Sequence, residues 1–333
     1  MATSELFPDS LQAGMCSNDQ SAIFNEFIQR CANLQPMKAA VSWPNSDVAL
    51  AGAMEAFQAG LILPILVGAE MQLRALAEHL AIDLRPFRIV DAKDAQEAAV
   101  HSVELCRAGE ASALMKGDLH TDLLMSAVID KQSGLRGLRR MSHIFIVDAP
   151  LYSRTLLISD AAINIYPTLE DKVDIVQNAI WLAHSLGNPQ PRVAILSAVE
   201  TVNPKIISTV DAASLCKMAE RGQIAGGILD GPLAFDTAVS VQAAAIKRLS
   251  SPVAGAADIL IVPDLESGNM LAKQLEYLAG AHLAGIVVGA RVPIILTSRA
   301  DPACARLASC AIAALFAEYE RSDTKTSPVH GAI

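Results

Sequence analysis

The chain has 333 residues, of which 52% are hydrophobic, 18% charged and 4% aromatic, and its formal net charge is −9. This aliphatic composition excludes a disordered protein, and the negative charge argues against a general nucleic-acid-binding surface. The length exceeds the size at which one hydrophobic core usually keeps growing, so we expect two domains.

The beginning of the chain and its cysteines indicate the cellular environment. The opening stretch "MATSELFPDSLQAG" lacks the basic flank and apolar run of a signal peptide. No apolar run is long and continuous enough to span a bilayer. The six cysteines form no CxxC pair, which argues against a zinc ribbon or a thioredoxin-type site. We therefore expect a soluble protein of the reducing cytoplasm, with no membrane contact.

After residues 1–20, which read as a loose tail, short apolar runs alternate with amphipathic helical patterns. Asn45 or Ser46 can cap the first helix, and Gly60 can end it. The expected strands are 38–44, 61–68, 87–91 and 111–117, and the expected helices are 47–60, 69–81 and 94–109. This alternation is typical of βαβ units and predicts a mostly parallel sheet.

The middle of the chain begins with two strand-like runs, "HIFIVDAP" and "RTLLISDAAI", separated by "LYS". This pattern predicts a hairpin, which can mark the start of the second domain. A strong helix follows at 168–187, where Thr168 and Asp171 can form a capping box and Gly187 a C-terminal stop.

The remaining strands are expected at 192–197, 224–231 and 257–264, with helices between them, and then at 284–290 and 292–298. A final helix should run from about 302 to 320. We place one α/β domain at 1–144 and 290–333, with a second loose tail at 321–333, and the other α/β domain at 145–289.

Polar or glycine-bearing residues follow several of the predicted strands. In open α/β sheets, ligands bind beyond the carboxyl ends of the strands, so this clustering is the main functional signal. The residues concerned are Lys116-Gly117-Asp118, Asp160, Asp230-Gly231-Pro232, the segment from Asp264 to Asn269, and Ser298-Arg299.

The stretch "VPIILTSRADP" brings Ser298 and Arg299 to a place where a strand gives way to a helix. A plain helix start is one interpretation, since Asp301 is a good N-cap and Pro302 suits the first helical position. An anion site is the other, because a guanidinium matches phosphate and helix N-termini attract negative charge. The motif alone leaves both open.

The other motifs also have a structural alternative. In "DGPLAFD", Gly-Pro fits a tight turn and Asp236 can cap the next helix. In "DLESGNM", backbone N–H groups can hold phosphate or a carbonyl oxygen, although an ordinary cap explains the pattern as well. Lys116 either binds substrate or is a solvated lysine. The basic cluster Arg136, Arg139 and Arg140 is either a nucleotide-phosphate site or a solvated loop.

Several common fingerprints are absent from the sequence. It has neither GxGxxG nor GxxxxGK[ST], the dinucleotide and P-loop signatures. It also has neither the GxSxG nucleophile elbow nor HExxH.

Five ordered motifs resemble the phosphotransacylase family, which comprises phosphate acetyltransferase and phosphate butyryltransferase. They are "MKGDLHTDLLMSAV", "LISDAAINIYPTLEDKVDIVQNAI", "DGPLAFDTAVS", "SPVAGAADILIVPDLESGNMLAKQL" and "AGIVVGARVPIILTSRAD". The likeness runs from about Ala39 to the final helix. The residues of "DGPLAFD" and "LTSRAD" are closer to the butyryl-type branch than to the acetyl-type branch.

The resemblance implies a two-domain fold like that of isocitrate and isopropylmalate dehydrogenases, with mostly parallel sheets and an interdomain cleft. It also implies reversible transfer of an acyl group between coenzyme A and inorganic phosphate, through an acyl phosphate. Coenzyme A would be a co-substrate, and we expect a homodimer with no metal and no bound redox cofactor.

That chemistry suggests roles for the strand-end residues. Arg299 can hold the departing phosphate, and Ser298 or a backbone N–H of Ser267-Gly268 can bind the carbonyl oxygen. A thiol has a pKa near 8.5, so a nearby carboxylate helps to form the thiolate. Acetyl-type members carry a candidate catalytic aspartate where this chain has Ala305. The general base is therefore open between Asp301, Asp230 and Asp236.

The remaining expected site residues bind substrate. They are Lys116, Gly117, Thr121, Asp160, Asn164, Gly231, Pro232, Asp264, Ser267, Gly268 and Asn269, with Arg139 and Arg140 supplying positive charge for phosphate or coenzyme A. Two other classes of function stay open. One is a metal- and NAD-dependent hydroxy-acid dehydrogenase of the same fold, and the other is a non-catalytic acyl-CoA-binding protein.

Overall fold

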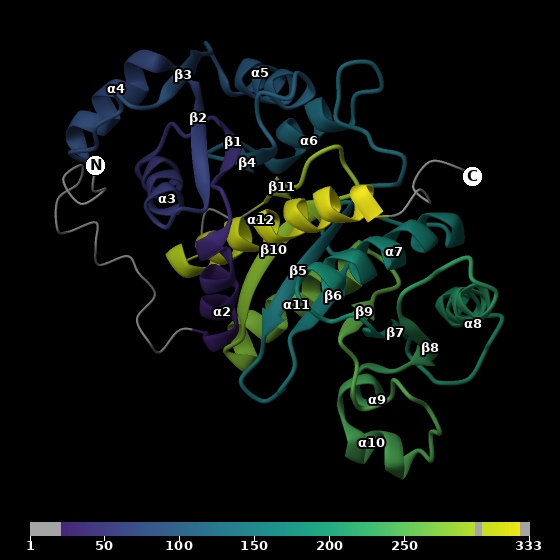
Figure 1. Ribbon diagram of the computed structural model, residues 1–333. Coiled ribbons are helices and arrows are strands. Elements are labelled where there is room, and N and C mark those ends of the chain that lie inside the picture. The colour runs from purple at the N-terminus through teal and green to yellow at the C-terminus, as the bar shows by residue number, and fades with distance from the viewer. Residues whose placement is uncertain (1–20, 297–301, 327–333) are drawn as a thin grey trace. The chain divides into compact units, whose positions relative to one another are not determined.

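The computed structural model describes residues 21–296 and 302–326 (Figure 1). The segment 297–301, which contains Ser298, Arg299 and Asp301, lies outside the described residues. The chain divides into two compact units: unit 1 comprises 1–138 and 284–333, and unit 2 comprises 139–283. The sequence predicts domain boundaries at 144/145 and 289/290, and these remain predictions.

Unit 1 is a mostly parallel sheet in the strand order β3-β2-β1-β4-β11-β10. Among the described strands of this unit, β10 and β11 pair antiparallel, and the other neighbours run parallel. The strands are β1 (Met37–Ser42), β2 (Ile62–Gly68), β3 (Arg88–Asp91), β4 (Ala113–Lys116), β10 (His282–Val288) and β11 (Ile294–Ile295). The chain builds outward from β1 to β3 and then returns to place β4 on the other side of β1, so the strand order reverses between β1 and β4.

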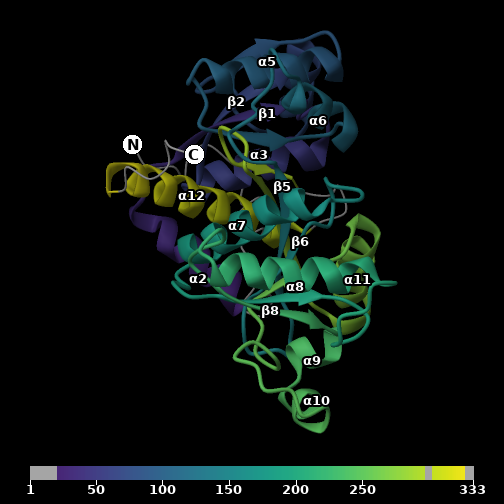
Figure 2. The same cartoon turned by 90° about the vertical axis from the view of Figure 1, so that its right-hand side faces the viewer.

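Helices cover both faces of this sheet, because right-handed crossovers on the two sides of β1 lie on opposite faces. Helix α5 packs with α6 on one face, while α12 packs with α3 and α2 on the other (Figure 2). The helices of unit 1 are α2 (Ala22–Arg30), the short 3₁₀ helix η2 (Cys31–Asn33), α3 (Asp47–Gln58), α4 (Glu70–His79), α5 (Ala95–Arg107), α6 (Thr121–Ile129) and α12 (Ala303–Thr326).

Unit 2 has the strand order β5-β6-β9-β7-β8. The predicted hairpin is confirmed as the antiparallel pair β5–β6, and β6, β9, β7 and β8 run parallel. The strands are β5 (Ser142–Asp148), β6 (Leu156–Ser159), β7 (Arg192–Leu196), β8 (Ile228–Leu233) and β9 (Ile259–Ile261). Because four neighbouring strands are parallel, their carboxyl ends meet at one edge and their amino ends at the opposite edge.

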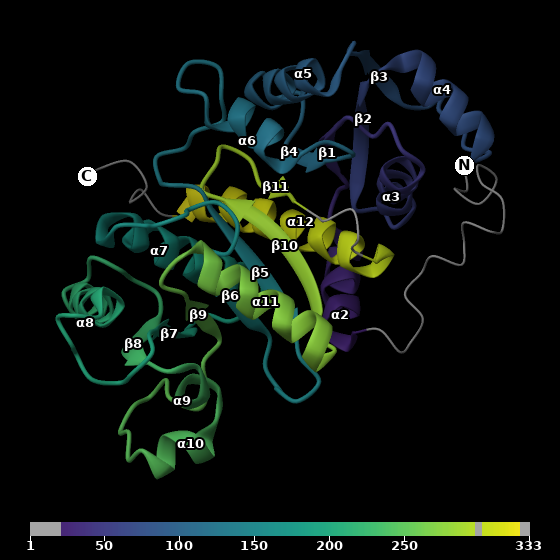
Figure 3. The same ribbon diagram turned by 180° about the vertical axis from the view of Figure 1, so that it is seen from behind.

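Helices α7 (Leu169–Ser185) and α8 (Ile207–Glu220) pack on one face of the unit 2 sheet. Helix α11 (Leu265–Ala279) lies over the other face (Figure 3), and the short helices α9 (Phe235–Val239) and α10 (Val241–Ile246) follow β8. Apolar side chains of neighbouring strands, such as Ile158, Leu260 and Ala194, form one buried cluster between these layers.

Local signals in the sequence placed several helix ends correctly. Ser46 caps α3, since its hydroxyl accepts a hydrogen bond from the N–H of Ala49 at 3.4 Å. The capping box of Thr168 and Asp171 is present at the start of α7. The final helix is confirmed and continues beyond the predicted end, to Thr326.

The tight turn offered as the structural alternative for Gly231-Pro232 is not formed, because both residues lie inside β8, which continues past the predicted strand end at Gly231. The strand stays paired with β7 on both sides of Gly-Pro, from Asp230 beside Ala194 to Leu233 beside Leu196, across a shift in register. An edge strand tolerates proline, since no neighbour needs the missing N–H. These residues are therefore part of the sheet and not a loop beyond its end.

Candidate active site

In unit 1, the carboxyl ends of β1 and β4 form the point at which the strand order reverses. Ser42 ends β1 and Lys116 ends β4, and the two residues are partners in the parallel ladder. The crevice at such a reversal is where open α/β sheets bind ligands. The predicted strand-end residue Lys116 therefore lies at the position of the unit that best suits a ligand.

Lys116 is only 7% exposed, so it is not the solvated lysine of the structural alternative. Its ammonium lies 3.4 Å from the carbonyl oxygen of Gly117. Beside it, Ser42 is fully buried, and its hydroxyl has no hydrogen-bond partner among the described residues. A buried hydroxyl without a partner is rare in folded proteins and calls for an explanation, such as a ligand.

Gly117 allows the two strand ends to approach closely. Its N–H donates to the carbonyl oxygen of Ser42 at 2.9 Å. A Cβ atom at this position would lie 2.5 Å from that oxygen and 2.6 Å from the carbonyl oxygen of Trp43. No residue larger than glycine fits there without moving the backbone. Thr121 follows as the first residue of α6.

Strand β11 brings the chain to the same edge of the unit 1 sheet. Ile295 pairs with Met115, the residue before Lys116, in a parallel ladder. Leu296 comes next and is buried. The described chain therefore reaches the segment 297–301 from a strand end beside Lys116.

In unit 2, Asp160 organises the loop after β6. Its side chain is buried, and one carboxylate oxygen accepts hydrogen bonds from the N–H groups of Ala162 at 2.9 Å and Ile163 at 3.0 Å. The other oxygen accepts from the backbone N–H and the side-chain amide of Asn164. Burial raises the pKa of the Asp160 carboxyl, and these hydrogen bonds act against that rise.

The arginine cluster is tied to this loop and to α7. The guanidinium of Arg140 donates to the amide oxygen of Asn164 and pairs with Asp171 at 2.9 Å. Arg139 pairs with Asp174 at 3.1 Å and lies over the ring of Trp181, 4.5 Å from its centre. Carboxylates of α7 thus compensate both arginines, which fix the loop to the helix.

The start of α11 packs against the same loop. A Cβ atom on Gly268 would lie 3.0 Å from the carbonyl oxygen of Asp160 and 2.7 Å from a methyl group of Val262. The amide of Asn269 donates to the carbonyl oxygen of Ala161 at 3.2 Å. The structure therefore brings together the predicted residues of the 160–164 loop and of the α11 start.

The α11 start is also an ordinary helix cap. One carboxylate oxygen of Asp264 accepts from both the N–H and the hydroxyl of Ser267, each at 2.8 Å. The N–H of Gly268 donates to the carbonyl oxygen of Asp264 at 3.2 Å. Because both N–H groups are engaged, they are poor donors for a substrate carbonyl, which leaves Ser298 as the candidate for that role.

Asp230 lies in β8, at the edge of the unit 2 sheet, and Asp236 follows in α9. Strand β8 stands three places from β6, which precedes Asp160, and strands are spaced by about 4.8 Å, so roughly 14 Å separates the two strands. Asp230 accepts a hydrogen bond from the N–H of Gly231 at 2.9 Å.

Asp236 takes part in an ion-pair network. Lys247 pairs with Asp236 at 3.1 Å and with Glu200 at 2.9 Å. The hydrogen bond from Lys247 lowers the pKa of both carboxyls. A carboxylate with a lowered pKa is a weaker proton acceptor, so Asp236 suits the role of an anchor for α9 and α10 better than that of a general base.

This network makes a pH-dependent contribution to stability. Carboxyls with pKa values lowered by folding stabilise the protein above their unfolded pKa values, and this stabilisation is lost as the pH falls through the folded values. We therefore expect Lys247→Met to lower the urea midpoint at neutral pH and to approach the wild-type midpoint below about pH 4. Lys205→Met is the control, because Lys205 is exposed and forms no ion pair with a described residue. If Lys247→Met lowers the urea midpoint equally at neutral pH and below about pH 4, the ion pairs of Lys247 do not make this contribution.

The described residues form neither a metal site nor a membrane span. Within residues 21–296 and 302–326, no group of three or more His, Cys, Asp or Glu side chains is arranged to hold a metal ion. The five cysteines of this part are free thiols. No helix in it is long and apolar enough to cross a bilayer.

Comparison with known proteins identifies relatives over most of the chain. Residues 94–314 match the family model described as phosphate acetyl/butaryl transferase. The phosphate acetyltransferase of Rhizobium meliloti is 54% identical over 303 residues, which cover 91% of this chain and 96% of that protein. The phosphate butyryltransferase of Clostridium acetobutylicum is 40% identical over 294 residues, or 88% of this chain and 98% of that protein.

A solved structure extends the likeness to the fold. The branched-chain phosphotransacylase from Enterococcus faecalis V583 has a TM-score of 0.73 with this structure and is 30% identical. The match covers 84% of this chain and 99% of that one. The α/β class expected from the sequence is confirmed.

Proposed function

This chain belongs to the phosphate acetyl/butaryl transferase family, and we propose on that basis that it catalyses reversible transfer of an acyl group between coenzyme A and inorganic phosphate. The observation that carries the proposal is the likeness over nine-tenths of the chain to a phosphate acetyltransferase, joined by a similar likeness to a phosphate butyryltransferase. The protein is thus an acyltransferase with acyl-CoA and phosphate as substrates and coenzyme A as a product.

In the direction of thioester synthesis, the thiol sulfur of coenzyme A attacks the carbonyl carbon of the acyl phosphate. A carbon–sulfur bond forms, the carbon–oxygen bond to phosphate breaks, and the thiol proton passes to a base. Negative charge grows on the carbonyl oxygen and on the departing phosphate. Donors placed at these two positions lower the barrier, because they stabilise charge that develops only in the transition state.

We assign these donors from the residues that the sequence predicts at strand ends. Arg299 holds the phosphate through paired, charge-assisted hydrogen bonds, and Ser298 donates to the carbonyl oxygen. Lys116 adds a buried positive charge at the strand end next to β11. Asp301 and Asp230 remain the candidates for the base, since the ion pair of Asp236 lowers its pKa.

Sequence identity alone does not show which acyl group the enzyme prefers. A relative named for acetyl transfer is 54% identical, while one named for butyryl transfer is 40% identical, so these identities do not favour the butyryl-type branch. The homodimer, the cytoplasmic location and the arrangement like isocitrate dehydrogenase, with its interdomain cleft, are further proposals that rest on the resemblance.

One assay tests the function and its rivals. We expect phosphate-dependent release of free thiol from acetyl-, propionyl-, butyryl- or isobutyryl-CoA, and the preferred thioester gives the chain length. Absorbance at the nicotinamide band with hydroxy-acid substrates and magnesium would favour the dehydrogenase. Binding of coenzyme A without phosphate-dependent loss of thioester would favour a non-catalytic binding protein.

Ser42 was not predicted from the sequence, and its buried hydroxyl gives a further test of the unit 1 site. If substrate uses this hydroxyl, we expect Ser42→Ala to lower turnover about tenfold, the worth of one hydrogen bond. The thermal midpoint should stay the same or rise, because the change removes a buried polar group that has no partner in the described chain. Ser112→Ala, before the amino end of β4, is the matched control and should leave turnover unchanged. Unchanged turnover in Ser42→Ala would exclude the hydroxyl from the site.

A further inference from the structure

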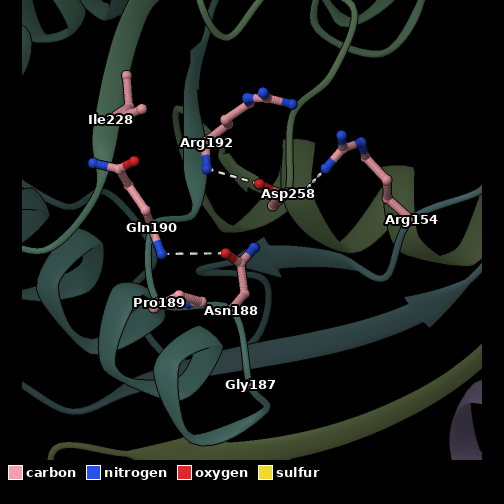
Figure 4. Close-up of a pocket in the computed structure, with 8 residues that line it drawn as sticks. All are labelled: Arg154, Gly187, Asn188, Pro189, Gln190, Arg192, Ile228 and Asp258. Atoms are coloured by element: carbon pink, nitrogen blue, oxygen red, sulfur yellow. Dashed lines mark hydrogen bonds and ion pairs between the residues drawn. The ribbon is translucent and has the colours of Figure 1, made fainter.

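A cavity of about 360 Å³ opens at the amino ends of the unit 2 strands (Figure 4). Arg192 and Ile228 begin β7 and β8, and Asp258 immediately precedes β9. The expected substrate-binding residues Asp160 and Asp264 follow the opposite, carboxyl ends of β6 and β9. The acyl-transfer proposal therefore gives this cavity no role.

Both oxygens of the buried Asp258 carboxylate already have hydrogen-bond partners. Asp258 is 6% exposed, and one of its oxygens accepts from the guanidinium of Arg154 at 2.9 Å. The other oxygen accepts from the backbone N–H of Arg192 at 2.8 Å. The side chain of Arg192 contributes to neither bond, and its guanidinium has no hydrogen bond or ion pair with a described residue. Arg192 thus presents an uncompensated cation at the cavity.

The charges around the cavity favour an anion. Two arginines face one carboxylate, which leaves one surplus positive charge. The hydroxyl of Tyr152 donates to the carbonyl oxygen of Ala257 at 2.6 Å. Burial raises the pKa of Tyr152, and the charges of Arg154 and Arg192 act against that rise. Arg154 and Arg192 both line the cavity, as Figure 4 shows.

The rest of the wall mixes amides with apolar groups. Asn188 accepts from the N–H of Gln190 at 3.3 Å, and the NH₂ group of Asn188 and the side-chain amide of Gln190 bond to no other described residue. Pro189 and Ile228 supply apolar surface. The last carbonyl groups of α7 nearby accept hydrogen bonds from the backbone of 186–188, which limits their negative field.

We propose that this cavity is a second, non-catalytic site for a small organic anion. A carboxylate or phosphoryl group of the ligand bonds to the planar fork of Arg192, which matches either oxyanion. The two amides supply further donors, and a short apolar part of the ligand lies against Pro189 and Ile228. The volume falls at the lower end of the range of ordinary small-molecule sites, so the ligand has only a few carbon atoms.

The test is a calorimetric titration of the full chain, with coenzyme A at saturation to occupy the catalytic site. Succinate is the carboxylate probe, and glycerol 3-phosphate is the phosphoryl probe in a second arm. We expect at least one probe to bind, and the probe that binds more tightly shows whether the site prefers a carboxylate or a phosphoryl group. Arg192→Gln should weaken that binding about tenfold or more, since it removes a charge-assisted fork. It keeps the backbone N–H that Asp258 needs, so the thermal midpoint and basal turnover should not change.

Arg221→Gln is the matched control, because Arg221 is an exposed arginine of unit 2 that does not line the cavity. It should bind the probe as the wild type does. The proposal is overturned if neither probe binds, or if Arg192→Gln binds as tightly as the wild type. A parallel loss of basal turnover in Arg192→Gln would assign the anion to the catalytic site and would also overturn it.

Discussion

Arg299→Lys is expected to lower turnover by about a hundredfold or more, the usual cost of losing one donor to a transition-state oxyanion. The change keeps the positive charge, so attraction of phosphate at long range survives. What it removes is the planar pair of donors that can bond two phosphate oxygens at once, which a lysine ammonium cannot reproduce. The loss should therefore fall mainly on turnover and less on the KM for phosphate.

The measurement is the rate of acyl-phosphate formation, or of arsenolysis, with the preferred acyl-CoA. Arg291→Lys serves as the control, since Arg291 is an exposed arginine of the loop between β10 and β11, and it should stay close to wild type. Near-normal turnover in Arg299→Lys would remove the guanidinium from its assigned role, while the family and fold would stand.

Features that depend on neighbours in sequence were predictable. The caps at Ser46 and Thr168 follow from side chains that reach three residues along the chain. The alternation of strands and helices, the hairpin of β5 and β6, and the position of Lys116 at a strand end follow from local patterns in the same way. Each needs only a few residues to fix it.

Features that depend on distant segments were not predictable from the pattern. The Gly-Pro of β8 reads as a turn unless the strand is known to lie at a sheet edge beside β7. The hydroxyl of Ser42 looks like an ordinary strand residue until β4 is placed next to β1. The contact of Asn269 with Ala161 joins residues 108 positions apart. One signal for Ser42 was present, because it is a polar residue that closes an apolar strand.

The two units also use their strand ends differently. In unit 2, the carboxylates of Asp160 and Asp264 are bonded within their own loops, and the amide of Asn164 donates to the carbonyl oxygen of Met141, so the predicted residues there shape a rigid surface. In unit 1, the hydroxyl of Ser42 is buried with no partner in the described chain, next to the buried Lys116. A buried hydroxyl that bonds to no described residue can still bond to a substrate. The hydroxyl of Ser42 therefore favours the unit 1 strand ends as the source of catalytic donors.

Gly117→Ala is expected to destabilise the protein by about 3 kcal/mol, the upper range for overpacking a closely packed site. Its new methyl group would lie 2.5 Å from the carbonyl oxygen of Ser42 and 2.6 Å from that of Trp43. Both are backbone atoms held by hydrogen bonds to Gly117 and Asp118, so no side chain can rotate away. The strand ends must separate, and the urea midpoint should fall.

The same displacement would move Lys116, because it precedes Gly117 in the chain. Turnover of the folded variant, measured below its unfolding transition, should therefore drop about a hundredfold, the effect of a shift of about 1 Å in a catalytic group. Gly109→Ala is the matched control: its new Cβ meets nothing within 4 Å, and its φ of 72° costs about 1 kcal/mol for a residue other than glycine. It should lower stability slightly and leave turnover intact. If Gly117→Ala loses stability but keeps full turnover, the end of β4 supports the fold without taking part in the reaction.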